Sequence, residues 1–228
     1  MTVPWEDCLI RLPDGRRLSC AVRGDPKSPP VVLMHGWPGS RLDGRLLDTA
    51  LHTKDVQLIV PDRPGFGNSD PLPNRTLLDW PHDIAALADS FGFHQIAVIR
   101  YSGGAPYALA CAHGLRDRLS GVAIVSGMAP VHTVRAMITI PPYLSTLFAL
   151  CRRRQSVALL PTGLMALGVR PFPEAIAAQA RLTARGSDRT VLRRESVLDT
   201  LKAGYREAFR QGVQNVAYEV SLFSRPWG

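Results

Sequence analysis

The sequence predicts an α/β fold: a mostly parallel sheet with helices on both faces and an α-helical cap over one edge. Three observations predict it. Short, almost wholly apolar runs alternate with helical patterns between about residues 30 and 126, as in parallel sheets buried on both faces. One such run leads into a glycine-rich turn that carries Ser102. After residue 128 the pattern is helical, with proline breaks and no convincing strand.

The first part of the chain supplies strands. Residues 8–12 and 17–23 flank the turn-forming run Pro-Asp-Gly at 13–15 and predict a hairpin. The apolar runs at 30–34 and 56–60 predict strands buried on both faces.

Helices and two further strands follow. We expect a helix that ends near His52 and an amphipathic helix at residues 76–91. Residues 95–99 and 119–125 predict two more buried strands. The chain then divides into a core at residues 1–128, a helical cap at 129–222 and a return towards the core at 223–228.

The composition is that of a globular chain with a sizeable core, because 46% of its 228 residues are hydrophobic and 20% are charged. The net charge is +8, but the basic residues form no lysine-rich block with interleaved aromatics. We therefore expect no nucleic-acid partner. Because no apolar stretch could span a bilayer and no signal-peptide pattern is visible, we expect no membrane partner and a cytoplasmic location.

The cysteines give no sign of a metal site or a redox motif. They are Cys8, Cys20, Cys111 and Cys151, and they form no CxxC pair and no cluster with histidine. Cys20 and Cys111 lie in apolar stretches, so we expect them to be small core residues. The sequence indicates neither a metal nor a cofactor.

Three loops are expected to meet at one edge of the sheet. They begin at His35, Asp62 and Ser102, each directly after a predicted strand. The carboxyl ends of parallel strands share an edge, which is where such sheets carry their chemistry. A serine on a sharp strand-to-helix turn can be a nucleophile. Taken alone, however, Ser102 is better explained as the N-cap of the following helix.

Four motifs together favour the nucleophile. They are HGWPGS at residues 35–40, DRPGFGNSD at 62–70, YSGGAPYALA at 101–110 and RPWG at 225–228. In this order, after these strands, the chain resembles the α/β-hydrolase fold family, in its capped serine hydrolase branch. Related capped members use an aspartate nucleophile to open epoxides or remove halogens, and serine at position 102 argues against those reactions.

The resemblance implies a role for each matching residue. Ser102 matches the nucleophile, and the backbone N–H groups of Gly103 and Trp37 match the two donors of the oxyanion hole. The remaining matches support the loops, and they are His35, Gly36, Asp62 and Gly104. His35 is implied to hold the oxyanion loop in shape rather than to act as a base.

Arg100 departs from the family pattern. Such turns carry small residues two places before and two places after the serine, so that strand and helix pack closely. Gly104 meets this need and Arg100 does not. We expect the long arginine side chain to leave the turn past the helix, and Arg100→Gly to raise the melting temperature.

The chain also lacks the usual partners of the serine. In the family the acid and the histidine follow later strands, which here would lie beyond Gly228, so we expect a chain truncated before them and a bare hydrophobic edge of the sheet. Of the six histidines, only His132 follows a strand at the carboxyl edge. It is a poor stand-in, because a cap loop rather than the sheet sets its position.

Two functions from different classes follow. The first is hydrolysis of a carboxylic ester or a related acyl bond through an acyl-Ser102 intermediate. Its substrate would be a small molecule with an apolar group. The second is a non-catalytic hydrolase-fold protein that binds an apolar ligand or a partner, which Arg100 and the missing base favour. Homo-oligomerisation stays open.

Overall fold

The computed structural model describes residues 4–138, 140, 142–169, 174, 178, 181–182 and 184–227. Within them the chain forms one six-stranded sheet with the order β1-β2-β4-β3-β5-β6. The strands are β1 (Glu6–Arg11), β2 (Arg17–Arg23), β3 (Pro30–Met34), β4 (Gln57–Pro61), β5 (Ile96–Ser102) and β6 (Leu119–Gly127). Strands β4, β3, β5 and β6 run parallel, while β1 and β2 pair antiparallel. The prediction of a mostly parallel sheet is confirmed.

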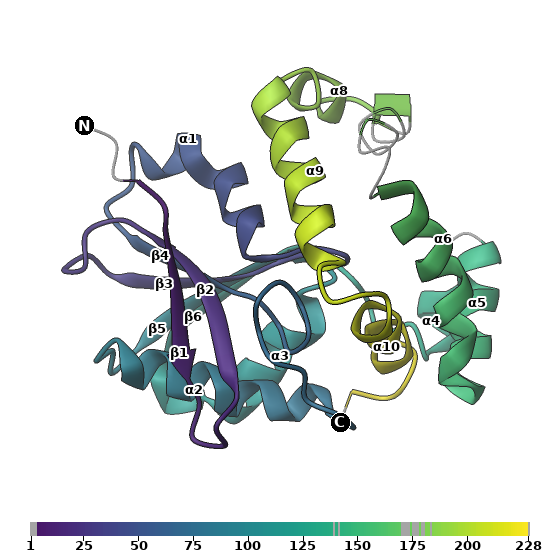
Figure 1. Cartoon of the computed structure of the whole chain (residues 1–228), viewed down its shortest axis with the longest axis horizontal. Helices are drawn as coiled ribbons and strands as arrows, with labels where there is room; N and C mark the ends of the chain where they lie inside the picture. The colour runs from purple at the N-terminus through teal and green to yellow at the C-terminus, as the bar shows by residue number, and fades with distance from the viewer. Residues whose placement is uncertain are drawn as a thin grey trace.

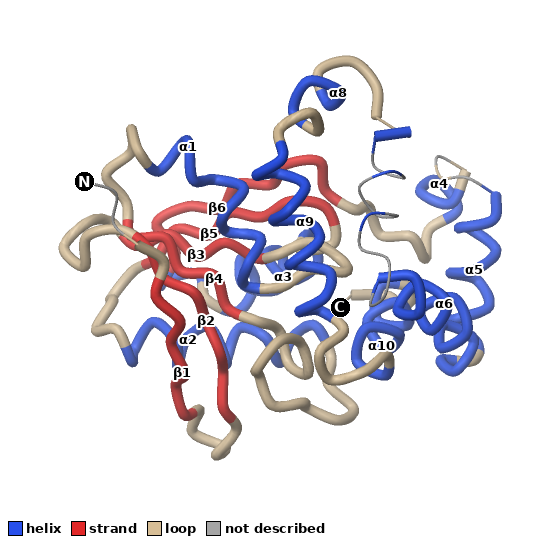
Figure 2. The backbone as a smooth tube through the Cα atoms, turned by 45° about the horizontal axis from the view of Figure 1, so that its top comes forward, coloured by secondary structure: helices blue, strands red, loops and turns tan. Residues whose placement is uncertain are grey.

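Helices cover both faces of this sheet (Figures 1 and 2). They are η1 (Arg41–Leu47), α1 (Asp48–Leu51), η2 (Leu77–Asp79), α2 (Trp80–Ser90), α3 (Ala105–Gly114) and η3 (Arg116–Arg118). Helices α2 and α3 pack together on one face, and η1 and α1 lie on the other. The predicted helix ending near His52 is therefore a 3-10 helix for most of its length, continued by one α-helical turn.

After β6 the described part of the chain contains helices joined by loops and turns, and no strand. It contains α4 (Val134–Met137), α5 (Pro142–Arg153), η4 (Gln155–Ala158), α6 (Leu159–Val169), α8 (Asp188–Val191), α9 (Glu195–Ala208) and α10 (Gln214–Phe223). Helices α4, α5 and α6 gather at one end of the molecule, and α10 lies between them and the sheet (Figure 1). No helix within the described ranges is both long and apolar enough to cross a lipid bilayer.

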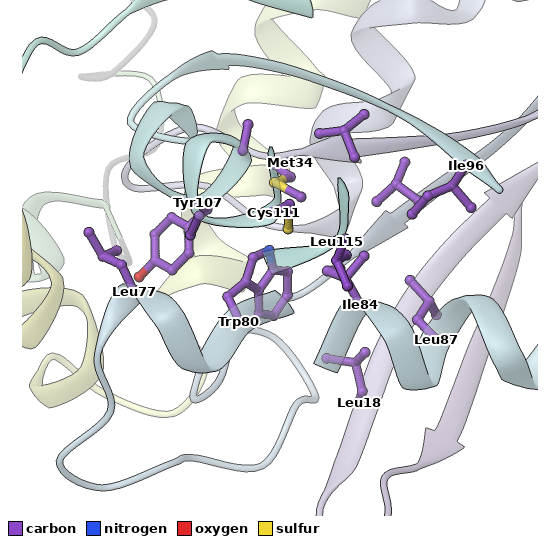
Figure 3. Close-up of a cluster of buried hydrophobic side chains, with 14 of the residues drawn as sticks. Leu18, Met34, Leu77, Trp80, Ile84, Leu87, Ile96, Tyr107, Cys111 and Leu115 are labelled. Atoms are coloured by element: carbon purple, nitrogen blue, oxygen red, sulfur yellow. The ribbon is translucent and has the colours of Figure 1, made fainter. Parts of the chain in front are cut away.

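Side chains of the central strands β3 and β4 are mostly buried on both faces, because helices cover both. On β3, Val32 and Met34 join the larger core cluster beneath α2 and α3, while Leu33 packs into the smaller cluster beside η1. Figure 3 shows the larger cluster, in which Trp80 of α2 meets Tyr107 of α3 edge to face at 5.9 Å between ring centroids. These two layers fix the carboxyl ends of β3, β4 and β5, where the candidate site lies.

Strand β6 contradicts the prediction of a buried strand. Its side chains are mostly exposed, with Ile124 at 46% and Val125 at 59% of their full accessibility. The cause is position: β6 forms the edge of the sheet and pairs only with β5. An apolar run alone does not reveal which strand will end a sheet.

Cys20 is a small core residue, as expected, and it also forms a disulfide, which the sequence did not predict. Cys20 is buried, but it faces Cys8 across the β1–β2 hairpin and is disulfide-bonded to it. The spacing of the two cysteines carries no motif, since their meeting depends on the register of the hairpin. Cys111 is a buried free thiol, as expected.

Candidate active site

Ser102 lies at a sharp turn between strand and helix. It is the last residue of β5, its side chain is exposed, and its φ of 51° places it in the left-handed region. That conformation costs a non-glycine residue about 1–3 kcal/mol and persists only where the surroundings enforce it. Helix α3 begins at Ala105 with Gly104 as its N-cap. The alternative of Ser102 as an N-cap is therefore wrong.

Two backbone N–H groups lie close together beside this turn. A carbon built as Cβ on Gly103 would come within 3.0 Å of the Trp37 backbone N and 2.6 Å of Trp37 Cβ. Neither N–H has a hydrogen-bond partner among the described residues. Two unpaired N–H groups that lie this close together can both donate to one oxygen atom.

Gly104 allows the turn to pack against the end of β3. A Cβ at this position would lie 2.7 Å from the carbonyl oxygen of Met34 and 3.0 Å from that of His35. Only glycine leaves room for this approach. The small residue two places after the serine thus has a steric reason in this chain.

His35 is fully buried and both of its ring nitrogens are engaged. Nδ1 lies 3.0 Å from the Gly36 carbonyl oxygen, and Nε2 accepts the Arg63 backbone N–H at 3.3 Å. These partners assign the proton to Nδ1. Burial, followed by the nearby Arg63 guanidinium, lowers the pKa of His35 well below its usual value. A neutral imidazole joining two loops suits a supporting role.

Asp62 organises the loop after β4. Its carboxylate accepts the Arg41 backbone N–H at 2.6 Å and Arg41 Nη1 at 3.0 Å. Gly67, with φ of 49°, approaches so closely that a Cβ would lie 2.0 Å from Asp62 Oδ2. Burial raises the pKa of Asp62, and the Arg41 guanidinium opposes that rise. Asp62 therefore holds a loop together and faces its own partners rather than Ser102.

The expectation that the Arg100 side chain leaves the turn is wrong. Arg100 is 0% exposed. Its side chain turns back under the strand, and Nη1 donates to the Ser102 carbonyl oxygen at 2.7 Å. Its Nε and Nη2 have no partner among the described residues, and burial lowers the pKa of the guanidinium. The space exists because Gly127 of β6 has no side chain, and a Cβ there would lie 1.9 Å from Arg100 Nη2.

The structure brings no base to the serine within the described residues. No hydrogen bond joins the Ser102 hydroxyl to a histidine or a carboxylate there. His132 is half-buried in the loop after β6, and its buried Nδ1 has no partner. Nor does this part of the chain contain a group of three or more His, Cys, Asp or Glu residues that could hold a metal ion.

Sequence reasoning missed a set of buried charges around the site. Glu219 of α10 accepts Arg63 Nε at 2.7 Å, Arg75 Nη2 at 3.1 Å and the Tyr107 hydroxyl at 2.6 Å. A glutamate inside the apolar run of α10 was a usable signal, because an unpaired carboxylate is not tolerated there. The Trp37 indole reaches the same helix, donating to the Val216 carbonyl oxygen at 3.0 Å.

Comparison with solved structures supports the fold. The chain is similar to an epoxide hydrolase from Vigna radiata, with a TM-score of 0.65, 20% identity, and coverage of 96% of this chain and 73% of that one. It is also similar to epoxide hydrolase A from Mycobacterium thermoresistibile, with a TM-score of 0.64, 21% identity, and coverage of 98% and 76%. At such identities the likeness concerns the fold.

Curated relatives align over about half of the chain's length or less. A proline iminopeptidase from Xylella fastidiosa is 33% identical over 113 residues, which is 48% of this chain and 36% of the relative. Epoxide hydrolase B from Mycobacterium tuberculosis is 30% identical over 105 residues, or 45% of this chain and 30% of the relative. The chain thus matches about a third of the length of these relatives.

A family model described as the alpha/beta hydrolase fold matches residues 29–162. The match runs from β3 through the turn at Ser102 into α6, so it includes the three loops at the carboxyl edge. Because it spans more than half of the 228 residues, this chain belongs to the α/β-hydrolase fold family.

Proposed function

We propose that the protein hydrolyses a carboxylic ester or a related acyl bond through an acyl-Ser102 intermediate. One observation carries the proposal. The left-handed turn exposes the Ser102 hydroxyl at the edge of the sheet, and the unpaired N–H groups of Gly103 and Trp37 lie together beside it. Serine at this position also favours acyl chemistry over epoxide opening, although epoxide hydrolases are among the similar proteins.

The proposed step is nucleophilic acyl substitution. Ser102 Oγ bonds to the carbonyl carbon, and the electrons of the C=O bond move to the oxygen. The N–H groups of Trp37 and Gly103 bind that oxyanion, and each such fixed donor is typically worth about 3–4 kcal/mol. The leaving group departs with a proton, and water then releases the acid and restores the serine. The hydroxyl proton must pass to a base, and none contacts Ser102 within the described residues.

The cap supports a substrate with an apolar group. The Trp37 side chain contacts two apolar clusters that include Ala166 of α6, Val216 of α10 and Cys151 of α5. Trp37 is also the residue whose N–H we propose as an oxyanion donor. A substrate bound at Ser102 would therefore meet a largely apolar wall formed by the cap helices.

A fluorophosphonate probe tests the proposal. Displacement of fluoride by Ser102 Oγ would add one phosphonyl group, detectable by intact-protein and peptide mass spectrometry. We expect labelling of Ser102 that is lost in Ser102→Ala. Ser126→Ala is a matched control, because Ser126 is also exposed and has a positive φ of 46°. Absence of labelling in the wild-type protein would contradict the proposal.

A second candidate is a non-catalytic protein that binds an apolar ligand. The observation that favours it is the serine without a contacting base, above a buried arginine with unpaired donors. The result that distinguishes this candidate is saturable binding of an apolar fluorescent ligand to a protein that the fluorophosphonate probe does not label. The Trp37→Ala substitution should weaken that binding.

We also propose a cytoplasmic location, against which the Cys8–Cys20 disulfide counts, and the redox state of this pair in cells tests it. Structural disulfides are rare in cytosolic proteins. Alkylation of both thiols in freshly lysed cells would support the proposal. An intact disulfide after trapping would contradict it.

A further inference from the structure

Two buried charged residues without a part in the proposed reaction lie on either side of Gly36. Asp43 of η1 is 4% exposed, and Arg63, just after β4, is 0% exposed. The Gly36 N–H donates to Asp43 Oδ2 at 3.3 Å, and the Gly36 carbonyl oxygen accepts Arg63 Nη2 at 2.9 Å. The residue before Trp37 is thus held between a carboxylate and a guanidinium.

Glu219 of α10 fixes the orientation of the Arg63 guanidinium. Its Nε and Nη2 donate to the two carboxylate oxygens of Glu219 at 2.7 and 2.9 Å, and Nη1 donates to the His35 carbonyl oxygen at 2.6 Å. A two-point contact with a carboxylate fixes the plane of a guanidinium. Lysine could not replace these contacts, because a single ammonium cannot span two carbonyls and a carboxylate.

The geometry of one peptide group links Arg63 to the proposed oxyanion donor. The Gly36 carbonyl and the Trp37 N–H belong to the same peptide unit, which is planar, and in a trans unit they point in opposite directions. Holding the Gly36 oxygen therefore holds the direction of the Trp37 N–H. The Trp37 nitrogen lies beside Gly103, the second proposed donor.

Asp43 joins the same loop to the turn that carries the serine. Besides the Gly36 N–H, its Oδ2 accepts the Tyr101 hydroxyl at 2.6 Å, and Tyr101 is the residue before Ser102. The Tyr101 ring packs so closely on Gly36 that a Cβ there would lie 3.1 Å from the ring. The loop and the turn are therefore connected through one buried carboxylate.

We propose that Arg63 and Asp43 are positioning residues that clamp the two peptide units on either side of Gly36, Arg63 through the His35 and Gly36 carbonyl oxygens and Asp43 through the Gly36 N–H, and so aim the Trp37 N–H at the oxyanion. The proposal rests on the proposed function, because it concerns a donor of that reaction. It extends that function by assigning the alignment of the donor to two charges that touch neither substrate nor serine.

The test compares Arg63→Lys with Arg23→Lys at pH 8. Arg23 of β2 is a suitable control, since it is also buried and paired with a carboxylate, that of Asp48, at a different place in the fold. Two quantities are measured: the exchange rate of the Gly36 amide by NMR, and the rate of Ser102 phosphonylation. Global stability is measured in parallel, so that local and global effects are separated.

We expect Arg63→Lys to speed Gly36 exchange by about 10-fold or more, beyond any change in the amides of β4 and β5. Phosphonylation should slow by about 10- to 100-fold, as for a misplaced oxyanion donor. Arg23→Lys should leave both rates unchanged. A lower melting temperature with unchanged rates in Arg63→Lys would overturn the proposal, since it would show a structural role alone.

Failure of the proposed function gives a different pattern. If the wild-type protein is not labelled, the Gly36 exchange still decides whether the clamp exists.

Should Arg63→Lys not fold, Asp43→Asn provides the second variant, because it keeps the shape of the side chain and removes its charge. Faster Gly36 exchange in Asp43→Asn supports the clamp, and unchanged exchange overturns it.

Discussion

Arg100 is a buried cation whose burial opposes folding. Its guanidinium is 0% exposed, and two of its three nitrogens have no partner among the described residues. Desolvating a cation without full hydrogen bonding is expensive, and apolar replacements of buried charges are often stabilising. The arginine nevertheless fills the space beside Gly127, which glycine at position 100 would leave empty.

We therefore expect Arg100→Met to raise the free energy of unfolding by about 1–3 kcal/mol, because methionine fills the space without a charge. Arg100→Gly should gain less, since it also creates a cavity. Denaturant unfolding of both variants measures the two differences. A methionine variant less stable than the wild-type protein would show that the bond to the Ser102 carbonyl oxygen outweighs the burial of the charge.

Asp43 should make stability depend on pH. Burial raises its pKa in the fold to about 6 from a model-peptide value of 3.8, against the bonds from Tyr101 and the loop amides. The titratable groups that face Asp43 are Arg63, Tyr101 and Tyr205. The Arg63 guanidinium lowers the pKa of Asp43, and the two phenols are neutral. Because the folded state holds this proton more tightly than the unfolded state, the contribution to stability is full below pH 3.8 and is lost as the pH rises to about 6.

Asp43→Asn removes that titration. The stability of the variant minus that of the wild-type protein should therefore rise by about 3 kcal/mol between pH 3.5 and pH 7, at about 1.4 kcal/mol per pKa unit. Urea unfolding at four pH values measures it. A difference that does not change with pH would mean that Asp43 keeps its ordinary pKa in the fold.

The strand-to-helix turn at Ser102 was predictable from the sequence because its signal is local. A strand, a Ser-Gly-Gly run and a helix follow one another within a few residues, and the structure has them in those places. The partners of the buried charges were not predictable in this way. Tyr101 and Asp43 are 58 residues apart, and Arg63 and Glu219 are 156 apart. Such pairs depend on how the elements are arranged.

Among the described elements, α10 links the helices after β6 to the sheet through buried contacts. Its Glu219 is 0% exposed and joins Arg63, Arg75 and the Tyr107 hydroxyl. Its Val216 carbonyl receives the Trp37 indole. The helix thus connects the loop after β4, helix α3 and the loop after β3, which are the three elements around the candidate site.

Glu219→Gln should destabilise the protein by about 3–5 kcal/mol, because two buried guanidinium groups lose their carboxylate. Asp199→Asn is the matched control, since it breaks an exposed pair on α9 with Lys202, in which the aspartate side chain is 67% exposed. Such pairs contribute about 0–1 kcal/mol. Thermal and urea unfolding compare the two. Equal effects would contradict the importance of the buried network.

The elements were predictable where their pattern is short-ranged. The strands at 17–23 and 30–34 have the predicted bounds, because alternation or continuous burial marks both. The 3-10 geometry of η1 was not predictable from periodicity, since the Asp43 side chain within it bonds to the distant Tyr101 and the N-cap Ser40 accepts the Leu42 N–H. In η1 the tertiary contacts of the side chains, rather than the helical periodicity of the sequence, determine the helix type.

On the scale of the whole molecule, β6 is the feature with the clearest consequence. This nine-residue strand exposes the apolar side chains of Val122, Ile124 and Val125, and one side of its backbone has no partner strand among the described residues. A bare hydrophobic edge of the sheet was expected from the sequence, and within the described residues β6 forms such an edge, whereas the burial expected for residues 119–125 is absent. Exposed edges of this kind pair with other chains.

We expect the protein to self-associate through β6, and Val125→Lys to reduce it. A lysine on an edge strand opposes pairing with a second strand. Val191→Lys is the control, because Val191 is 42% exposed on α8 and lies outside the sheet. Light scattering over a range of concentrations measures the mean mass. The same decrease in both variants would assign the effect to charge alone, and no decrease would contradict it.

The central claim is that the Trp37 and Gly103 N–H groups bind an oxygen carried by Ser102. A crystal structure of the phosphonylated protein tests it most directly. We predict the phosphonyl oxygen at about 2.7–3.1 Å from both backbone nitrogens. An adduct on Ser102 whose oxygen points to solvent, or an adduct on a different residue, would contradict the account.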